Sequence, residues 1–299
     1  MRRRLTYVLL LSLGSAALAA STLPQNPDGG APSPAQVQSF VARAIDNQHR
    51  DDLLLEEFDR VEHTQLRKTS ESSVVDDRRW RIVPVGTGLF RIALTPDDKP
   101  NDPILYRRQL ALIQASLQSA MQPDEYEEQA LAKYQKRLEE RAEMVTDIGK
   151  AFRFTWLGRE MRYGRLLAKV QLDPDLSFVP SSRTAEVLPH VRATLWFDES
   201  AEQVVHIEAE ITSDVYFGAG VFGKLYRGGR FWLDQAEIAP GIWEPVAHEY
   251  DFSGRKFLFG FEVHEKTEVS HYRRLGPLPQ RLAFIRNELN NAGTNHSGD

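Results

Sequence analysis

The segments VRATLWFD (residues 191–198) and VVHIEAEI (residues 204–211) alternate apolar and polar side chains with a period of two. This period is typical of β-strands that bury one face. Glycine-bearing turn sequences follow, between further strand-like segments: Gly228-Gly229, Pro240-Gly241 and Ser253-Gly254. Residues 191–272 are therefore expected to form a meander of at least five antiparallel strands, apolar on one face and polar on the other.

The first residues have the pattern of a secretory signal peptide. Three arginines at positions 2–4 precede an apolar run over residues 5–18, and Ala17-Leu18-Ala19 has the small-x-small form of a cleavage site. The apolar run is shorter than the roughly 20 residues that a membrane-spanning helix needs. We therefore expect residues 1–19 to be removed and the mature protein to reside in the periplasm or to be secreted.

Composition narrows the class of protein. The chain of 299 residues contains no cysteine, which excludes disulfide bonds, a thiol nucleophile and cysteine metal ligands. Its formal net charge is −5, and it becomes −8 without the three arginines of the signal region. An acidic chain without a basic stripe argues against nucleic-acid binding. No stretch after residue 20 is long and apolar enough to span a membrane.

Helices are expected before and between the strands. Residues 20–33 are rich in Pro, Gly and Asn and predict a flexible linker. Ser33-Pro34 then combines an N-cap hydroxyl with a proline at the first helical position, so a helix should start there. Two amphipathic helices separated by Pro123 are expected over about residues 103–148. The other predicted elements are strands at 58–67, 77–85 and 89–94, strands from Ala151 to Leu172, a helix at 279–289, and a disordered tail at 291–299.

Four local motifs within this order of elements carry a resemblance to a known superfamily. They are Trp156–Glu160 with Gly164–Leu167, then Leu195–Asp198, Phe231–Asp234 and Gly241–Pro245. The pattern resembles the lipoprotein-carrier superfamily of LolA, LolB and the sensor RseB. The resemblance implies one α+β domain over residues 34–290, in which about 103–148 form a helical insertion. It implies a strongly curved antiparallel sheet of about eleven strands, a half-open barrel, with helices on the concave side.

The resemblance also implies a function. A protein of this superfamily would be a non-enzymatic envelope protein that binds lipid or lipoprotein acyl chains, for transport or sorting to the outer membrane. The alternatives are a stress sensor of the RseB kind, which acts through a protein partner, and a metal-dependent hydrolase. No cofactor is expected. Eight aromatic side chains could line a ligand groove or simply form the core: Phe152, Phe154, Trp156, Trp232, Tyr250, Phe257, Phe259 and Phe261. The last three are spaced to share one strand face.

Polar motifs have simpler explanations than catalysis. The sequence GAGVFG (218–223) matches the dinucleotide fingerprint, but a strand and not a helix is predicted to follow it, which excludes that site. His206, Glu208 and Glu210 share a strand face that should be solvent-exposed, because Val205, Ile207, Ala209 and Ile211 lie opposite. Their spacing along a strand is too long to ring one metal ion. His248 is expected in the core. No serine-hydrolase or zinc-protease motif is present.

Overall fold

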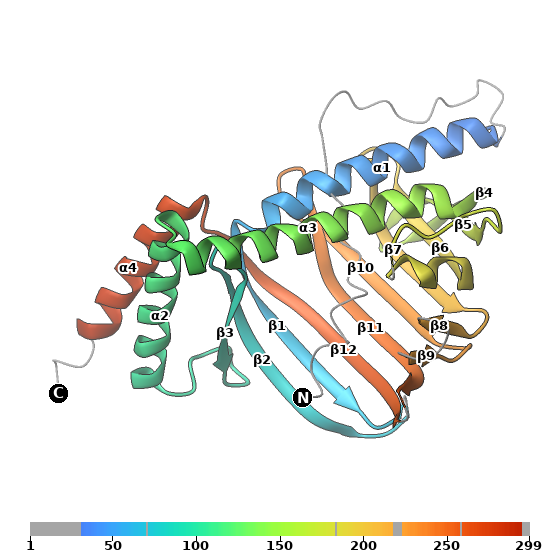
Figure 1. Ribbon diagram of the computed structural model, residues 1–299. Helices are drawn as coiled ribbons and strands as arrows, with labels where there is room; N and C mark the ends of the chain where they lie inside the picture. The colour runs from blue at the N-terminus through green and yellow to red at the C-terminus, as the bar shows by residue number, and fades with distance from the viewer. Residues whose placement is uncertain (1–30, 70, 183, 218–222, 258, 295–299) are drawn as a thin grey trace. The chain divides into compact units, whose positions relative to one another are not determined.

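A computed structural model describes residues 31–69, 71–182, 184–217, 223–257 and 259–294 (Figure 1). Its helices are α1 (Pro34–Leu55), α2 (Pro103–Met121), α3 (Glu125–Ala151) and α4 (Leu278–Thr294), with the 3-10 helix η2 (Ala185–His190). Its strands are β1 (Phe58–Arg67), β2 (Val74–Pro84), β3 (Leu89–Leu94), β4 (Phe152–Arg162), β5 (Arg165–Pro174), β6 (Val191–Asp198), β7 (Gln203–Ile211), β8 (Val215–Phe217), β9 (Gly223–Leu225), β10 (Arg230–Ala239), β11 (Ile242–Lys256) and β12 (Phe259–Arg274).

The strands form an open antiparallel sheet. Hydrogen-bonded neighbours follow the order β3-β2-β1-β12-β11-β10-β7-β6-β5-β4, while the short strand β9 pairs with β11 and with β8. The two ends of this order, β3 and β4, do not pair with each other, so the sheet is not closed into a barrel. This confirms the predicted α+β class and antiparallel sheet, with twelve strands instead of about eleven.

The chain divides into two compact units. Unit 1 contains the described parts of residues 1–53, 66–74 and 140–266, and unit 2 contains those of residues 54–65, 75–139 and 267–299. Each unit has a hydrophobic core of its own. In unit 1, α1 and the last turns of α3 lie over one face of the strands (Figure 1).

The helix start predicted at Ser33 forms for the expected chemical reason, and a second helix start has a similar cap. The backbone N–H of Ser33 donates to Gln36 Oε1 at 2.7 Å, and the N–H of Gln36 donates to Ser33 Oγ at 3.3 Å, which is a capping box. Asp102 Oδ1 accepts from the backbone N–H groups of Ile104 and Leu105 at 2.8 and 3.2 Å, and so caps α2. Pro123 separates α2 from α3, as predicted.

Three predictions near the C-terminal end are wrong. Ser253-Gly254 lies inside β11 and makes no turn; the strand continues to Lys256. Phe257, with φ of +53°, comes after β11, and β12 starts at Phe259, so Phe257, Phe259 and Phe261 do not share one strand. The positive φ at Phe257 breaks the extended conformation that the alternation of side chains predicted. Finally, α4 continues to Thr294, so residues 291–294 are helical where a disordered tail was expected.

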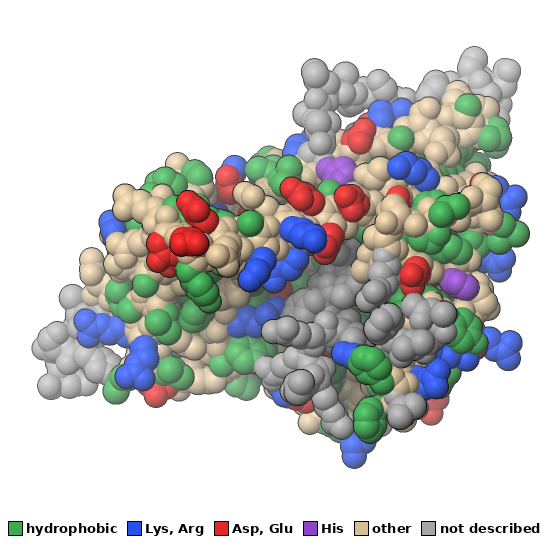
Figure 2. Space-filling model, viewed as in Figure 1, with side chains coloured by type: hydrophobic (Ala, Val, Ile, Leu, Met, Phe, Trp, Pro, Cys, Tyr) green, Lys and Arg blue, Asp and Glu red, His purple; other side chains and the backbone are tan. Residues whose placement is uncertain are grey.

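Some predicted features fall on residues that are not described. The signal peptide, all but the last three residues of the linker, and residues 295–299 belong to this group. So do residues 218–222 of the GAGVFG motif, but its last residue, Gly223, begins β9. The described residues after the motif therefore form a strand. Among the described residues, no helix is long and apolar enough to cross a membrane. Figure 2 shows acidic and basic side chains interspersed over one face of the molecule.

Candidate functional site: an apolar cavity in unit 1

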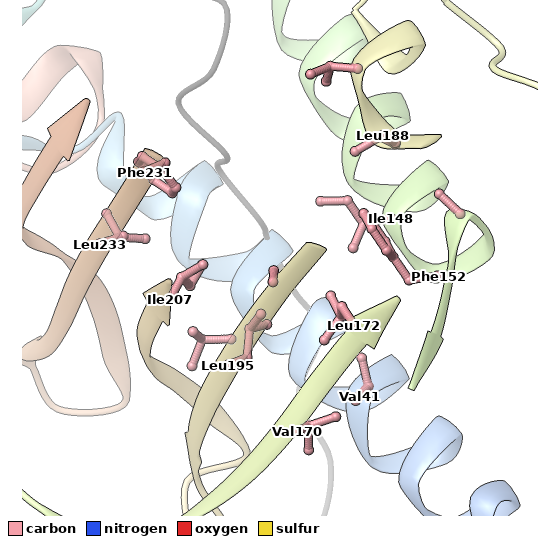
Figure 3. Packing of buried hydrophobic residues seen from close by; sticks show 14 of the residues in the cluster. Val41, Ile148, Phe152, Val170, Leu172, Leu188, Leu195, Ile207, Phe231 and Leu233 are labelled. Carbon is pink, nitrogen blue, oxygen red and sulfur yellow. The ribbon is translucent and has the colours of Figure 1, made fainter. Parts of the chain in front are cut away.

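Unit 1 contains a cavity of about 90 Å³. It lies between the helices and the strands that they cover, among residues that belong largely to the hydrophobic core of unit 1. Figure 3 shows part of this core, with side chains from α1, α3, η2 and the strands β4, β5, β6, β7 and β10 directed toward one another. The described lining residues are Val41, Ala44, Ile45, Met144, Ile148, Phe152, Leu172, Val187, Leu188, Val191, Ala193, Leu195, Phe197, Val204, Ile207, Ala209, Glu210, Ile211, Gly229, Phe231 and Phe252.

The helices contribute one apolar stripe each. Val41, Ala44 and Ile45 are spaced i, i+3 and i+4 on α1, so they lie on one side of the helix. Met144 and Ile148 are spaced i and i+4 in the last turns of α3. These apolar faces of α1 and α3 supply one wall of the cavity.

The strands contribute side chains that alternate as the sequence predicted. Ala193, Leu195 and Phe197 lie on one face of β6, and Leu195 is directly opposite Ile207 on β7. The prediction for Val205 is wrong. A register shift after Trp196 places Val204 in the cavity lining, whereas Val205 packs in a separate cluster with Leu167, Trp196 and Trp243. An extra residue in one strand reverses the facing of the residues beyond it, which strict alternation does not anticipate.

Polar contacts along one side fix α1 above the sheet. Asp51 is fully buried, and its Oδ2 accepts from Gln203 Nε2 at 2.7 Å and from the backbone N–H of Trp243 at 3.0 Å. Arg43 Nε donates to Glu202 Oε1 at 2.8 Å. Burial raises the pKa of Asp51, although hydrogen bonds from Trp243, Arg50 and Gln203 oppose the shift. These bonds tie α1 to the β6–β7 connection and to the first residues of β7 and β11.

The side chains that line the cavity are almost all apolar. Among the described lining residues, Glu210 has the one titratable side chain, and it is exposed. A buried water molecule needs two to four polar partners, so an apolar cavity of this kind stays dry and accepts apolar molecules instead. Acid–base or nucleophilic catalysis needs positioned polar groups, which this lining does not offer.

The eight predicted aromatic residues are not gathered in one place. Phe152 lines the cavity. Tyr250 is buried in the same core, where its ring stacks on Phe231 with centroids 5.2 Å apart. Phe154, Trp156 and Phe261 are half-buried against that core.

The remaining three lie elsewhere. Trp232 alternates with Phe231 and Leu233 on β10 and therefore lies on the opposite face of the strand. Phe257 and Phe259 are 52% and 78% exposed. Sequence reasoning missed Phe197, Phe231 and Phe252 as lining residues. The alternation of apolar residues in β6 and β7 was a better signal for this site than aromatic content.

A polar cluster lies on the other side of the same strands, around His206. The prediction that His206 is solvent-exposed is wrong, because only 3% of it is exposed, although Glu208 is exposed as predicted. Trp196, directly across on β6, packs edge-on against the imidazole at 5.0 Å between centroids. Long side chains on neighbouring strands thus bury a residue that the alternation pattern assigns to the polar face.

Hydrogen bonds complete this cluster. His206 Nδ1 lies 2.5 Å from Asp234 Oδ1, and since a carboxylate only accepts, Nδ1 carries the proton. Tyr163 Oη donates to the same Asp234 oxygen at 2.6 Å. Burial alone raises the pKa of Asp234, but these bonds from His206 and Tyr163 lower it below the usual value. Among the described residues, no group of three or more His, Asp or Glu side chains could hold a metal ion.

Unit 2 contains a buried ionic network. Arg81 donates to Asp59 at 2.8 Å and to Glu288 at 2.7 and 3.0 Å, and Arg273 also donates to Asp59. Tyr106 donates to Glu288 and is contacted by Arg81. Two guanidinium groups thus face two carboxylates, which balances the buried charge. The network thus links β1, β2, β12 and α4 within unit 2, and each of the four charged groups has an oppositely charged partner.

Comparison with known proteins gives remote likenesses. No protein-family model matches the chain, and no curated protein matches it. A domain from Vibrio parahaemolyticus described as an outer membrane lipoprotein-sorting protein is 10% identical, with a TM-score of 0.34, over 85% of this chain and 99% of that chain. A LolA superfamily protein from Nitrosomonas europaea is 11% identical, with a TM-score of 0.32, over 82% and 96%. A DUF1329 family protein from Desulfovibrio piger is 10% identical, with a TM-score of 0.30, over 80% and 92%. Likenesses at these values do not assign the chain to a family.

Proposed function

We propose that unit 1 binds a hydrophobic ligand, the acyl chain of a lipid or lipoprotein, in its apolar cavity. The lining supports this, because it is aliphatic and aromatic apart from Glu210 around a space of about 90 Å³. Each methylene group removed from water contributes about 0.8 kcal/mol, so a chain segment of a few carbons would gain several kcal/mol before ordering costs. The acyl chain is the ligand class that the resemblance to lipoprotein carriers implies.

In this proposal the protein is a carrier in the bacterial envelope and makes no covalent step. It takes up an apolar chain, shields it from water and releases it elsewhere, which is the physical requirement of transport or sorting. The cavity favours this role over catalysis because its described lining holds no nucleophile and no buried general base.

The test is a titration of the delipidated protein, residues 20–299, with a fluorescent fatty acid. Wild-type protein should bind in a saturable manner. The variant Ala193→Leu should bind at least about tenfold more weakly, because Ala193 lines the cavity and the three added carbons would occupy it. No saturable binding by wild-type protein would refute the proposal.

A matched control separates occupation of the cavity from a general loss of stability. Leu167 is fully buried, but in the separate cluster with Trp196, Val205 and Trp243. Leu167→Ala should destabilise the protein by about 2–5 kcal/mol and leave the affinity for the fatty acid unchanged. Equal affinities of Ala193→Leu and Leu167→Ala for the probe would place the ligand outside the cavity.

A further inference from the structure

The polar cluster around His206 holds the end of the β4–β5 hairpin against strands that lie beyond it. Arg162 is the last residue of β4, and its guanidinium lies 4.7 Å from the centre of the Trp196 ring on β6. The next residue, Tyr163, reaches Asp234 on β10 with its hydroxyl. In the sheet order, β5, β6 and β7 separate β4 from β10. The end of this hairpin therefore folds over the face of β6 and β7 that is opposite to the cavity.

The second ring nitrogen of His206 has two neighbours of opposite charge. Nε2 lies 2.7 Å from Arg162 Nη2 and 3.0 Å from Glu208 Oε1. Nδ1 carries the proton that is donated to Asp234, so Nε2 of the neutral ring is an acceptor. A guanidinium only donates and a carboxylate only accepts. The neutral imidazole can therefore bond Arg162 through Nε2, but it cannot bond Glu208.

A proton on Nε2 reverses this choice of partner. An imidazolium donates at both nitrogens, so Nε2 would donate to Glu208 and could no longer accept from Arg162. The imidazolium and the guanidinium, whose nitrogens lie 2.7 Å apart, would also repel each other. Imidazole is the side chain that ordinarily changes its charge between pH 5 and 8. The arrangement thus couples a proton to the bond that joins β4 to β7.

The other charged and titratable groups around the imidazole allow this exchange. Asp234 accepts from Nδ1 in both states and gives the imidazolium a counter-charge. Tyr163 donates to the same carboxylate at 2.6 Å in either state. On β5, Lys169 lies 4.8 Å from the centre of the Trp196 ring, and it pairs with Glu160 on β4 at 2.7 Å. The charge of this lysine is therefore balanced by a carboxylate of its own.

We propose that His206 is a proton-controlled switch, which holds the end of the β4–β5 hairpin at neutral pH and releases it in acid. In the neutral state, Arg162 bonds His206 across the sheet. In the charged state, His206 bonds Glu208 within β7. Arg162 then keeps its stacking on Trp196 and a longer contact of 3.5 Å with Glu208, but it loses its shortest bond to β7. None of these residues lines the cavity, so the switch is separate from ligand binding.

An NMR titration of the ¹⁵N-labelled protein, residues 20–299, from pH 8 to pH 4 tests the proposal. The imidazole signals of His206 should show a proton on Nδ1 at pH 8 and a second proton added to Nε2 as the pH falls. The guanidinium signals of Arg162 should shift with the same midpoint. Arg165 is the control in the same hairpin, because it bonds Asp198 at 3.1 Å and lies 5.6 Å from the centre of the Trp243 ring. Its signals should not follow the midpoint of His206.

Two variants change the neighbours of Nε2 and should move the midpoint of His206 in opposite directions. Arg162→Gln removes the competing cation, so the proton affinity of His206 should rise about tenfold. Glu208→Gln removes the charge of the acceptor, so the proton affinity should fall severalfold. Glu208 is exposed, and Glu208→Gln should therefore fold like the wild-type protein.

Amide hydrogen exchange shows whether the hairpin end is released. After correction for the intrinsic effect of pH, residues 159–166 of the wild-type protein should exchange severalfold faster at pH 5 than at pH 7.5. In His206→Gln, which cannot take up the proton, this difference should disappear. It should also disappear in Arg162→Gln, where exchange should be fast at both pH values, and this second variant decides the question if His206→Gln does not fold.

Three results would overturn the proposal. The first is a titration of His206 that leaves the signals of Arg162 unchanged, because the histidine would then have a structural role alone. The second is a shift of the Arg162 signals that follows the carboxylates near pH 4 instead of His206. The third is a neutral His206 at every pH at which the protein is folded.

Discussion

Filling the cavity of unit 1 should make the ligand-free protein more stable. Ala193 lines the cavity from β6 and is 7% exposed. An empty cavity costs about 24 cal/mol per Å³, so the present volume of about 90 Å³ corresponds to about 2 kcal/mol. Burial of the three carbons that Ala193→Leu adds gives a similar value, about 2.4 kcal/mol. Allowing for strain in the new side chain, we expect a gain of about 1–2 kcal/mol.

The same chemical change should have the opposite effect where no space exists. Ala168 is fully buried on β5 in the same core, but it does not line the cavity. Ala168→Leu should therefore force neighbouring side chains apart and cost about 1–3 kcal/mol. The contrast between the two alanines tests the position of the cavity and not merely the response of the core to larger residues.

Urea unfolding followed by tryptophan fluorescence is a suitable assay. Four of the five tryptophans, Trp156, Trp196, Trp232 and Trp243, belong to unit 1, and the background Trp80→Phe removes the fifth, which belongs to unit 2. The midpoint should rise for Ala193→Leu and fall for Ala168→Leu at an unchanged slope. A loss of stability in Ala193→Leu as large as that in Ala168→Leu would refute the presence of usable space at this position.

Two further predictions concern buried polar groups. His206→Ser should lower the free energy of unfolding by about 1–3 kcal/mol, because it leaves Asp234 without its buried donor. Glu208→Ser should change the free energy of unfolding by less than about 0.5 kcal/mol. Equal effects of the two substitutions in urea unfolding would contradict the burial assigned to His206. Folding raises the pKa of Asp51. The stability of the wild-type protein relative to Asp51→Asn should therefore increase as the pH falls through the folded pKa toward the unfolded value of about 3.9, and this gain should be lost as the pH rises. A stability difference between the two proteins that is the same at pH 7 and pH 4 would contradict this prediction.

Local chemistry made much of the fold predictable. Ser33 and Asp102 begin helices because their side chains satisfy backbone N–H groups, and this requirement is visible in a few residues. The predicted strands 58–67 and 89–94 coincide with β1 and β3. The β11–β12 connection was not predictable in this way. The alternation of Phe257, Phe259 and Phe261 runs across the connection without interruption, but the positive φ of Phe257 ends the extended conformation there.

The site was less predictable than the fold. Alternation in β6 identified Ala193 and Leu195 as one apolar face, but a core and a cavity have the same composition, and only the packing distinguishes them. The register shift that moves Val205 out of this face depends on how β6 and β7 pair, which no single strand reveals. The burial of His206 likewise depends on Trp196 across the sheet. The errors at this site therefore concern Val205 and His206, whose burial depends on how two neighbouring strands pair.

The place where a fatty acid binds is the most direct test of the central claim, and isoleucine methyl groups can report it. Ile45, Ile148, Ile207 and Ile211 line the cavity, whereas Ile92, Ile113 and Ile285 belong to the core of unit 2. In a protein labelled with ¹³C at the isoleucine δ1 methyl groups, titration with palmitate should shift the signals of the four cavity residues and leave those of unit 2 in place. Unchanged cavity signals at saturating palmitate, or shifts confined to unit 2, would contradict the account.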